Sequence, residues 1–343
     1  PAPRNALAMV TREPLGVIGA VVPWNYPMMI TSWKLGPALA MGNSIVVKPA
    51  ENSSLSALKM AELAVAAGLP AGVFNVVPGL GSEAGQALAR HMDVAKIAFT
   101  GSGPTGRKMM QYAAESNMKQ VSLELGGKSP QVVLNDCTDL EAAASTIAWA
   151  IYYNAGQTCN AGSRIIVEKG VKEELFAHLH KFLESFVVGN QFDPTTQMAG
   201  LVSELQRDRV NAYLDLVGQD GEKLIFGGQK TSGKDLLIKP TLIDNVKPGS
   251  RLAQEEIFGP VLVAIDAKDE AEALQLANGT EYGLAASVWT NNVARAHKFA
   301  RKLRAGTVWV NTFDMLDVIT PFGGFGASGN GRDKSLHALD AYS

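Results

Sequence analysis

Short apolar runs alternate with amphipathic segments along the first third of the chain. The runs are rich in valine, isoleucine and phenylalanine, which is typical of buried strands, and the segments between them have helical spacing. The predicted strands are 16–22, 44–47, 73–77, 94–100 and 121–125, and the predicted helices are 31–41, 54–67, 82–91 and 105–117. This alternation predicts a parallel sheet with helices on both faces, whose ligand sites lie at the carboxyl ends of the strands.

A second region with the same alternation follows. Its predicted helices are 140–154, 171–186, 270–278 and 293–303, and its predicted strands are 163–168, 258–265, 287–290 and 307–311. At 343 residues, the chain exceeds the size at which a single hydrophobic core usually stops growing. The pattern therefore predicts an α/β protein of two domains.

Composition and charge exclude several classes of partner. The chain is 46% hydrophobic and 19% charged, with a net charge of −2, which argues against nucleic acid or an anionic membrane as a partner. No apolar run reaches the length of a membrane span. The two cysteines are too few for a disulfide framework, which favours a reducing, cytoplasmic location. Five scattered histidines predict no metal site, and His178 and His180, two positions apart, point away from each other on a helix.

Two segments carry the candidate chemistry. Glu124 is followed by two glycines within Leu-Glu-Leu-Gly-Gly-Lys-Ser-Pro, and Cys159 lies in a loop of small and polar residues, about 35 positions later. A thiolate attacks a carbonyl carbon, and a carboxylate can then activate the water that releases the product. The pair predicts covalent acyl chemistry with a hydrolytic second step.

A glycine-rich loop follows the predicted strand 94–100. Residues 101–106 match the pattern G-x-G-x-x-G between a predicted strand and a predicted helix. Glu124 lies about twenty positions later, which is where a dinucleotide-binding fold has the acid that binds a ribose. Glu124, however, belongs to its own Glu-Leu-Gly-Gly segment at a strand end. We therefore predict that the loop contacts phosphate and that Glu124 does not bind ribose.

Two turns after predicted strands offer further polar groups. The turn Pro-Trp-Asn-Tyr-Pro contains Asn25, whose amide is a donor suited to a developing oxyanion, although an ordinary turn asparagine is the simpler interpretation. Lys48 and Glu51 follow the strand 44–47. Lys48 can reach a ribose or phosphate and Glu51 a ribose, although a solvated turn is the simpler interpretation.

In combination, these motifs resemble the NAD(P)-dependent aldehyde dehydrogenases. The matching segments run in the family's order across nearly the whole chain: Pro-Trp-Asn-Tyr-Pro at 23–27, Lys-Pro-Ala-Glu at 48–51, Phe-Thr-Gly-Ser at 99–102, Leu-Glu-Leu-Gly-Gly-Lys-Ser-Pro at 123–130, Gly-Gln-Thr-Cys at 156–159, Glu-Glu-Ile-Phe-Gly-Pro at 255–260 and Pro-Phe-Gly-Gly at 321–324. The resemblance implies a Rossmann-type cofactor domain and an α/β catalytic domain.

The resemblance also implies roles for individual residues. Cys159 becomes the nucleophile, Glu124 the general base, Asn25 with the backbone N–H of Cys159 the oxyanion hole, and Lys34 a proton relay. The residues implied to bind NAD, with NADP as a possible alternative, are Trp24, Lys48, Glu51, Gly101, Ser102, Gly106, Glu256 and Phe258. Glu51 should repel a ribose 2′-phosphate, which favours NAD. Cys137 matches no motif and is expected to be an inert small hydrophobe.

The resemblance places the domain boundaries as well. It implies a bridging or oligomerisation segment at 1–13, an NAD-binding domain at 14–125, a catalytic domain at 126–320 and a returning tail at 321–343. Members of the family carry additional segments before and after this region, so the chain is expected to be a fragment of the family pattern. A homodimer or homotetramer is expected for the full-length protein.

The substrate is the least specified feature. Asp314 and Asp317 precede the Pro-Phe-Gly-Gly motif, where relatives line the substrate entrance, and residues 329–339 resemble the tail of bacterial enzymes that oxidise aminobutyraldehyde derivatives. An ω-amino, ω-guanidino or γ-glutamylamino aldehyde is the hypothesis, although two solvated loop acids explain the aspartates equally well. The alternatives are a semialdehyde or betaine-aldehyde dehydrogenase, and a non-catalytic dinucleotide-binding fragment.

Overall fold

The computed structural model describes residues 4–343 and divides into two compact units. The first unit contains the residues up to Leu123, together with Val318–Pro321 and Gly331–Ser343, and the second contains Glu124–Asp317 and Phe322–Asn330. The predicted tail at 321–343 is therefore shared between the units. The assignment of functions to the predicted domains stays a prediction, and the first three residues of the predicted segment 1–13 lie outside the described residues.

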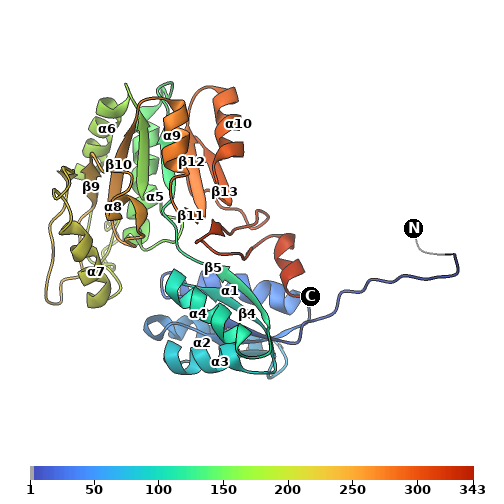
Figure 1. The fold of residues 1–343 in the computed structure, drawn as a ribbon. Helices are drawn as coiled ribbons and strands as arrows, with labels where there is room; N and C mark the ends of the chain where they lie inside the picture. The colour runs from blue at the N-terminus through green and yellow to red at the C-terminus, as the bar shows by residue number, and fades with distance from the viewer. Residues whose placement is uncertain (1–3) are drawn as a thin grey trace. The chain divides into compact units, whose positions relative to one another are not determined.

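The first unit is built on a five-stranded sheet with the order β3-β2-β1-β4-β5, blue to teal in Figure 1. Its strands are β1 (Val17–Val21), β2 (Ser44–Lys48), β3 (Phe74–Val76), β4 (Val94–Thr100) and β5 (Gln120–Glu124). The pairs β1–β2, β1–β4 and β2–β3 are parallel. This order is that of a dinucleotide-binding fold, in which the direction of winding reverses between β1 and β4.

Helices connect these strands. They are α1 (Pro27–Ala40), α2 (Leu55–Ala66), a π-helical turn (Gly81–Gly85) that leads into α3 (Gln86–Arg90), and α4 (Gly103–Ala114). Helix α1 contacts α2, and α3 contacts α4. The apolar strands are buried because these helices cover them: Ile18, Ala20, Ile45 and Val47 are wholly buried.

The second unit is built on a seven-stranded sheet with the order β13-β12-β6-β7-β10-β9-β8, green to orange in Figure 1. Its strands are β6 (Pro130–Val133), β7 (Arg164–Glu168), β8 (Lys223–Phe226), β9 (Thr241–Asp244), β10 (Val261–Ala267), β12 (Ala285–Trp289) and β13 (Thr307–Val310). All neighbouring pairs are parallel except β8–β9, which is antiparallel. The short strands β11 (Tyr282–Gly283) and β14 (Phe325–Gly326) form a separate antiparallel pair.

The helices of this unit are α5 (Leu140–Tyr152), α6 (Lys172–Glu184), α7 (Glu204–Leu214), α8 (Arg251–Gln254), α9 (Glu270–Ala277) and α10 (Val293–Lys302). Helix α6 packs on α5 through Leu175, Leu179 and Leu183, which recur at helical spacing and are buried. His178 and His180 lie on α6 beside Glu174 and Glu184. Among residues 4–343, no helix is long and apolar enough to cross a membrane.

Several predicted bounds differ from the structure, and four elements show the larger or more instructive differences. Helix α1 begins at Pro27 rather than at residue 31, because the fixed φ of proline suits the first turn of a helix. The predicted strand 258–265 begins only at Val261, because Phe258 has a φ of 61° and Pro260 follows it. The predicted helix 140–154 ends at Tyr152, since Asn154 and Ala155 have positive φ. The predicted helix 82–91 is also interrupted, by the π-helical turn.

Candidate active site

Cys159 lies in a tight turn between α5 and β7. Asn154, Ala155 and Gly156 adopt positive φ, and a side chain on Gly156 would collide with the carbonyl of Gly259. The Gln157 side-chain amide donates to the carbonyl of Asn154 over 3.1 Å and accepts from the Val202 N–H over 2.9 Å. Backbone strain of this kind persists only where the surroundings hold it, so the turn fixes the position of the thiol.

Glu124 and Glu256 are the carboxylates that act on this thiol most strongly. Glu124 ends β5 and is buried, with 3% of its surface exposed. Burial, followed by the charges of Glu256, Glu124 and Asp314, raises the pKa of Cys159 to about 12. Cys159 itself is only half-buried. The predicted nucleophile and base therefore lie in the same unit, within electrostatic reach of each other.

The Glu256 carboxylate lies against the backbone of the Gly-Gly pair that follows Glu124. It accepts a hydrogen bond from the Gly127 N–H over 3.1 Å, and a side chain on Gly126 would collide with it. A Cβ on Gly127 would lie 2.7 Å from the carbonyl oxygen of Cys159. At Gly127 the obstacle is backbone, so the close approach of the Cys159 carbonyl requires glycine there, whereas a side chain at position 126 would displace the Glu256 carboxylate. Removal from water raises the pKa of Glu256 to about 7.

Helix α7, which the sequence analysis missed, holds the segment of Glu256 and Phe258. Arg209 donates to the Glu256 carbonyl over 2.5 Å, and the Gln206 side chain donates to the Phe258 carbonyl over 2.7 Å. Ser203 caps the start of the helix, and its hydroxyl accepts from the Gln206 N–H over 3.3 Å. The sequence Ser-Glu-Leu-Gln matches the capping-box pattern, and this signal could have located α7.

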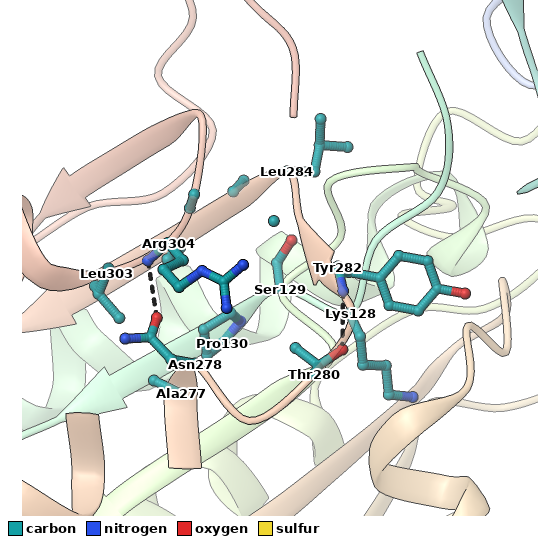
Figure 2. Close-up of a pocket in the computed structure, with 14 residues that line it drawn as sticks. Lys128, Ser129, Pro130, Ala277, Asn278, Thr280, Tyr282, Leu284, Leu303 and Arg304 are labelled. Carbon is teal, nitrogen blue, oxygen red and sulfur yellow. Dashed lines mark hydrogen bonds between the residues drawn. The ribbon is translucent and has the colours of Figure 1, made fainter. Parts of the chain in front are cut away.

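Lys128 is fully buried directly after the Gly-Gly pair. Its side chain extends beside Tyr282 at a small cavity of about 10 Å³, which has room for a single water molecule (Figure 2). Its Nζ has no hydrogen-bond partner among residues 4–343. Burial, and then the charge of Arg164, lowers the pKa of Lys128 to about 7.

Replacing Lys128 by methionine should remove a pH dependence of stability. The folded-state pKa lies below the unfolded value of 10.5, so the unfolded chain binds more protons between these values and the folded form gains stability as the pH rises. We expect the free energy of unfolding of the wild type, relative to Lys128→Met, to rise by roughly 3 kcal/mol between pH 7 and pH 10. Urea unfolding of both proteins at pH 7 and pH 10 measures this difference in the free energy of unfolding. A difference that is the same at the two pH values would contradict the prediction.

The first unit carries a second group of predicted residues at the carboxyl ends of its strands. Trp24 and Asn25 follow β1, Lys48 ends β2, and Gly101 and Ser102 follow β4. The ends of β1 and β4 form the edge at which the direction of winding reverses, where open α/β sheets bind ligands. Helix α4 begins at Gly103 and includes Gly106, so its N-terminal N–H groups lie in the same loop as Ser102.

Two buried lysines of the first unit are ion-paired. Lys48 contacts Glu51 over 2.9 Å, and Glu51 also accepts from the Gly81 N–H over 2.7 Å. Partial burial raises the pKa of Glu51, but hydrogen bonds within its own turn and the contact with Lys48 outweigh this and lower it. Lys34 contacts Asp333 over 2.5 Å, and both side chains are buried. Asp333 is a partner that the sequence analysis did not identify.

A cavity of about 270 Å³ borders the turn of Cys159 in the second unit. It is lined by Thr146, Trp149, Ala150, Tyr153, Thr158, Phe313 and Asp314. The side chain of Asn160, which directly follows Cys159, donates to Asp314 over 2.7 Å. Asp317, the second predicted acid of this segment, is exposed.

Known proteins share both the sequence and the fold. The model of the aldehyde dehydrogenase family matches residues 1–343. An NADP/NAD-dependent aldehyde dehydrogenase of Escherichia coli and an aminoacetaldehyde dehydrogenase of Pseudomonas aeruginosa are each 50% identical over 338 residues, which is 98% of this chain and 68% of theirs. The crystal structure of a γ-glutamyl-γ-aminobutyraldehyde dehydrogenase from Burkholderia cenocepacia is 52% identical, with a TM-score of 0.93 over 97% of this chain and 67% of that one. This chain belongs to the aldehyde dehydrogenase family.

Proposed function

We propose that this chain oxidises an aldehyde to a carboxylic acid through a thioester on Cys159, with NAD or NADP as the hydride acceptor. The observation that carries the proposal is the turn that holds Cys159 within electrostatic reach of the buried carboxylate of Glu124. A nucleophilic thiol next to a carboxylate supports acylation followed by hydrolysis.

The first half of the reaction uses Cys159 and Asn25. The thiol loses its proton to the solvent, its sulfur forms a bond to the aldehyde carbon, and the carbonyl electrons move to the oxygen. The Asn25 amide and the Cys159 N–H are suited to stabilise that oxygen. The carbon then loses hydride, its C–O double bond reforms, and the acyl group is left on sulfur. NAD(P), when bound, supplies the acceptor for this hydride.

The second half uses Glu124. Its carboxylate takes a proton from water while the water oxygen attacks the thioester carbon, and the C–S bond then breaks. The acid leaves, and the proton passes from Glu124 to the sulfur, which restores both the thiol and the carboxylate.

The residues of the first unit fit a dinucleotide. Thr100 ends β4 with a buried hydroxyl that has no hydrogen-bond partner within residues 4–343, and the glycine-rich loop and the N-terminus of α4 follow it, which suits a pyrophosphate. We assign the adenosine ribose to Lys48 and Glu51, and the pyrophosphate to Ser102 in its loop. In the second unit, we assign the nicotinamide ribose to Glu256 and the nicotinamide to Phe258. The Glu51 carboxylate favours NAD, because it repels a 2′-phosphate.

The substrate in this proposal is an aldehyde with a basic or amide-bearing tail. The names of the relatives, an aminoacetaldehyde dehydrogenase and a γ-glutamyl-γ-aminobutyraldehyde dehydrogenase, support this class. Asp314 at the cavity beside Cys159 supports a cationic tail. We further propose a cytoplasmic location, supported by two unpaired cysteines. The family resemblance supports a homodimer or homotetramer.

The proposal is tested by following NADH formation with NAD and a set of aldehydes matched in length. We expect turnover, with a kcat/KM at least tenfold higher for 3-aminopropanal than for propanal, because a carboxylate lies at the cavity and one order of magnitude corresponds to about 1.4 kcal/mol. A higher kcat/KM for propanal would overturn the substrate class. Absence of NADH with every aldehyde would overturn the proposed function.

A further inference from the structure

The cavity next to Cys159 combines aromatic walls with one acid. Trp149, Tyr153 and Phe313 contribute the aromatic surface, and among the described residues that line it only Asp314 carries a charge. Thr146, Trp149, Ala150 and Tyr153 are spaced three and four positions apart along α5 and its end, so they share one face. Aromatic faces and a carboxylate are the groups that bind an organic cation.

The walls of this cavity are held in place by their own contacts. The ring centroids of Trp149 and Phe186 are 5.2 Å apart, and those of Phe313 and Trp309 are 4.7 Å apart. The Trp309 indole N–H donates to the Met315 carbonyl over 3.2 Å, which fixes the chain on the far side of Asp314. Binding a cation here therefore requires little ordering of these side chains.

Asp314 is also connected to the nucleophile. It accepts a 2.7 Å hydrogen bond from Asn160, which is buried and directly follows Cys159, while Thr158, which directly precedes Cys159, lines the cavity. The charged groups that oppose ionisation of the thiol are Glu256, Glu124 and Asp314, and the Asn160 N–H favours it. Asp314 is the member of this set that lines the cavity.

We propose that Asp314 holds the ammonium or guanidinium end of the substrate in this cavity, and that the bound cation offsets the negative charge of Asp314 and so promotes ionisation of Cys159. The inference rests on the proposed function and extends it. A cationic aldehyde would then bind more tightly, and its charge would also increase the fraction of Cys159 that is ionised. A neutral aldehyde of the same length would have neither effect.

The decisive experiment measures the thiol without turnover. In a Cys137→Ala background, Cys159 is alkylated by iodoacetamide at a series of pH values between about 7 and 9, where a primary ammonium, with a pKa of about 10.4, keeps its charge. A carbon–sulfur bond forms, iodide leaves and the proton passes to the buffer. We expect n-propylammonium to shift this rate–pH profile toward lower pH by about one unit, which accelerates alkylation about tenfold at each pH. The neutral 1-propanol should not shift the profile. An unmoved profile, or a uniform decrease in rate, would overturn the proposal.

The Asp314→Asn variant separates charge from geometry. Asparagine retains an oxygen that can accept from Asn160 but removes the negative charge. We expect propylammonium to have no effect on alkylation in this variant, and the kcat/KM ratio of 3-aminopropanal to propanal to fall at least tenfold. Asp220→Asn, which removes an exposed carboxylate paired with Lys247, is the matched control and should keep both effects.

The two proposals fail in different ways. If alkylation of Asp314→Asn responds to propylammonium as the wild type does, the role of Asp314 is wrong even where NADH forms normally. If no aldehyde yields NADH while propylammonium still shifts the wild-type profile, the cation site stands and the proposed oxidation does not.

Discussion

Replacing Cys159 by alanine should abolish NADH formation with every aldehyde. The other cysteine of the chain, Cys137, is not expected to replace it, because Cys137 is buried and burial raises its pKa. Removing a nucleophile eliminates the covalent intermediate rather than weakening one contact, so we expect a loss of at least about 10⁴-fold in kcat. Stopped-flow and steady-state measurements at 340 nm follow the loss.

Cys137→Ala is the matched control for this prediction. It removes the same group at a site that no candidate motif includes, and turnover should persist. Circular dichroism of both variants tests whether the fold is retained. Aldehyde-dependent NADH formation by a folded Cys159→Ala protein would exclude Cys159 as the nucleophile.

The sequence located most of the candidate chemistry because it lies in short contiguous motifs. Glu124 and the Gly-Gly pair, the turn of Cys159, and the loop after β4 each occupy a few successive positions. Such segments depend on local backbone geometry, such as the positive φ at Gly156, which local sequence specifies directly. The strand order that brings β1 and β4 together also followed the usual rule for alternating strands and helices.

The contacts between segments that are distant in the sequence could not be predicted from the sequence. Lys34 and Asp333 are 299 positions apart, and Asn160 and Asp314 are 154 apart. Nothing in the local pattern of either residue specifies its partner, because these contacts follow from how the chain returns in space. The predicted strand at Phe258 failed for a related reason: its apolar side chain fits a strand, but Gln206 of α7 bonds to its carbonyl within a turn.

The electrostatics of the site were also missed. Burial, and then the negative charges of three carboxylates, raise the pKa of Cys159, and no cation is among the groups that act on it most strongly. This arrangement keeps the thiol protonated at neutral pH. It links activation of Cys159 to whatever positive charge enters its surroundings.

Replacing Glu124 by glutamine should separate the two halves of the reaction. The amide cannot take a proton from water, whereas the attack by Cys159 and the loss of hydride remain. We expect a burst of about one NADH for each Cys159, followed by a steady-state rate lowered by 10²–10⁴-fold, the usual contribution of a general base. Stopped-flow absorbance at 340 nm resolves the two phases.

An added nucleophile makes this prediction more specific. After the burst, gel filtration removes the free aldehyde, which hydroxylamine would otherwise convert to an oxime. Hydroxylamine then attacks the thioester carbon through nitrogen, displaces the thiolate and forms about one hydroxamate for each Cys159, so it should rescue Glu124→Gln for a second burst without help from the missing base. Glu62→Gln, at an exposed pair with Lys59, is the matched control and should show no burst beyond that of the wild type. Full steady-state turnover of Glu124→Gln, or a stalled variant that hydroxylamine does not rescue, would exclude Glu124 as the base for hydrolysis, because a stalled thioester is the one state that both observations require.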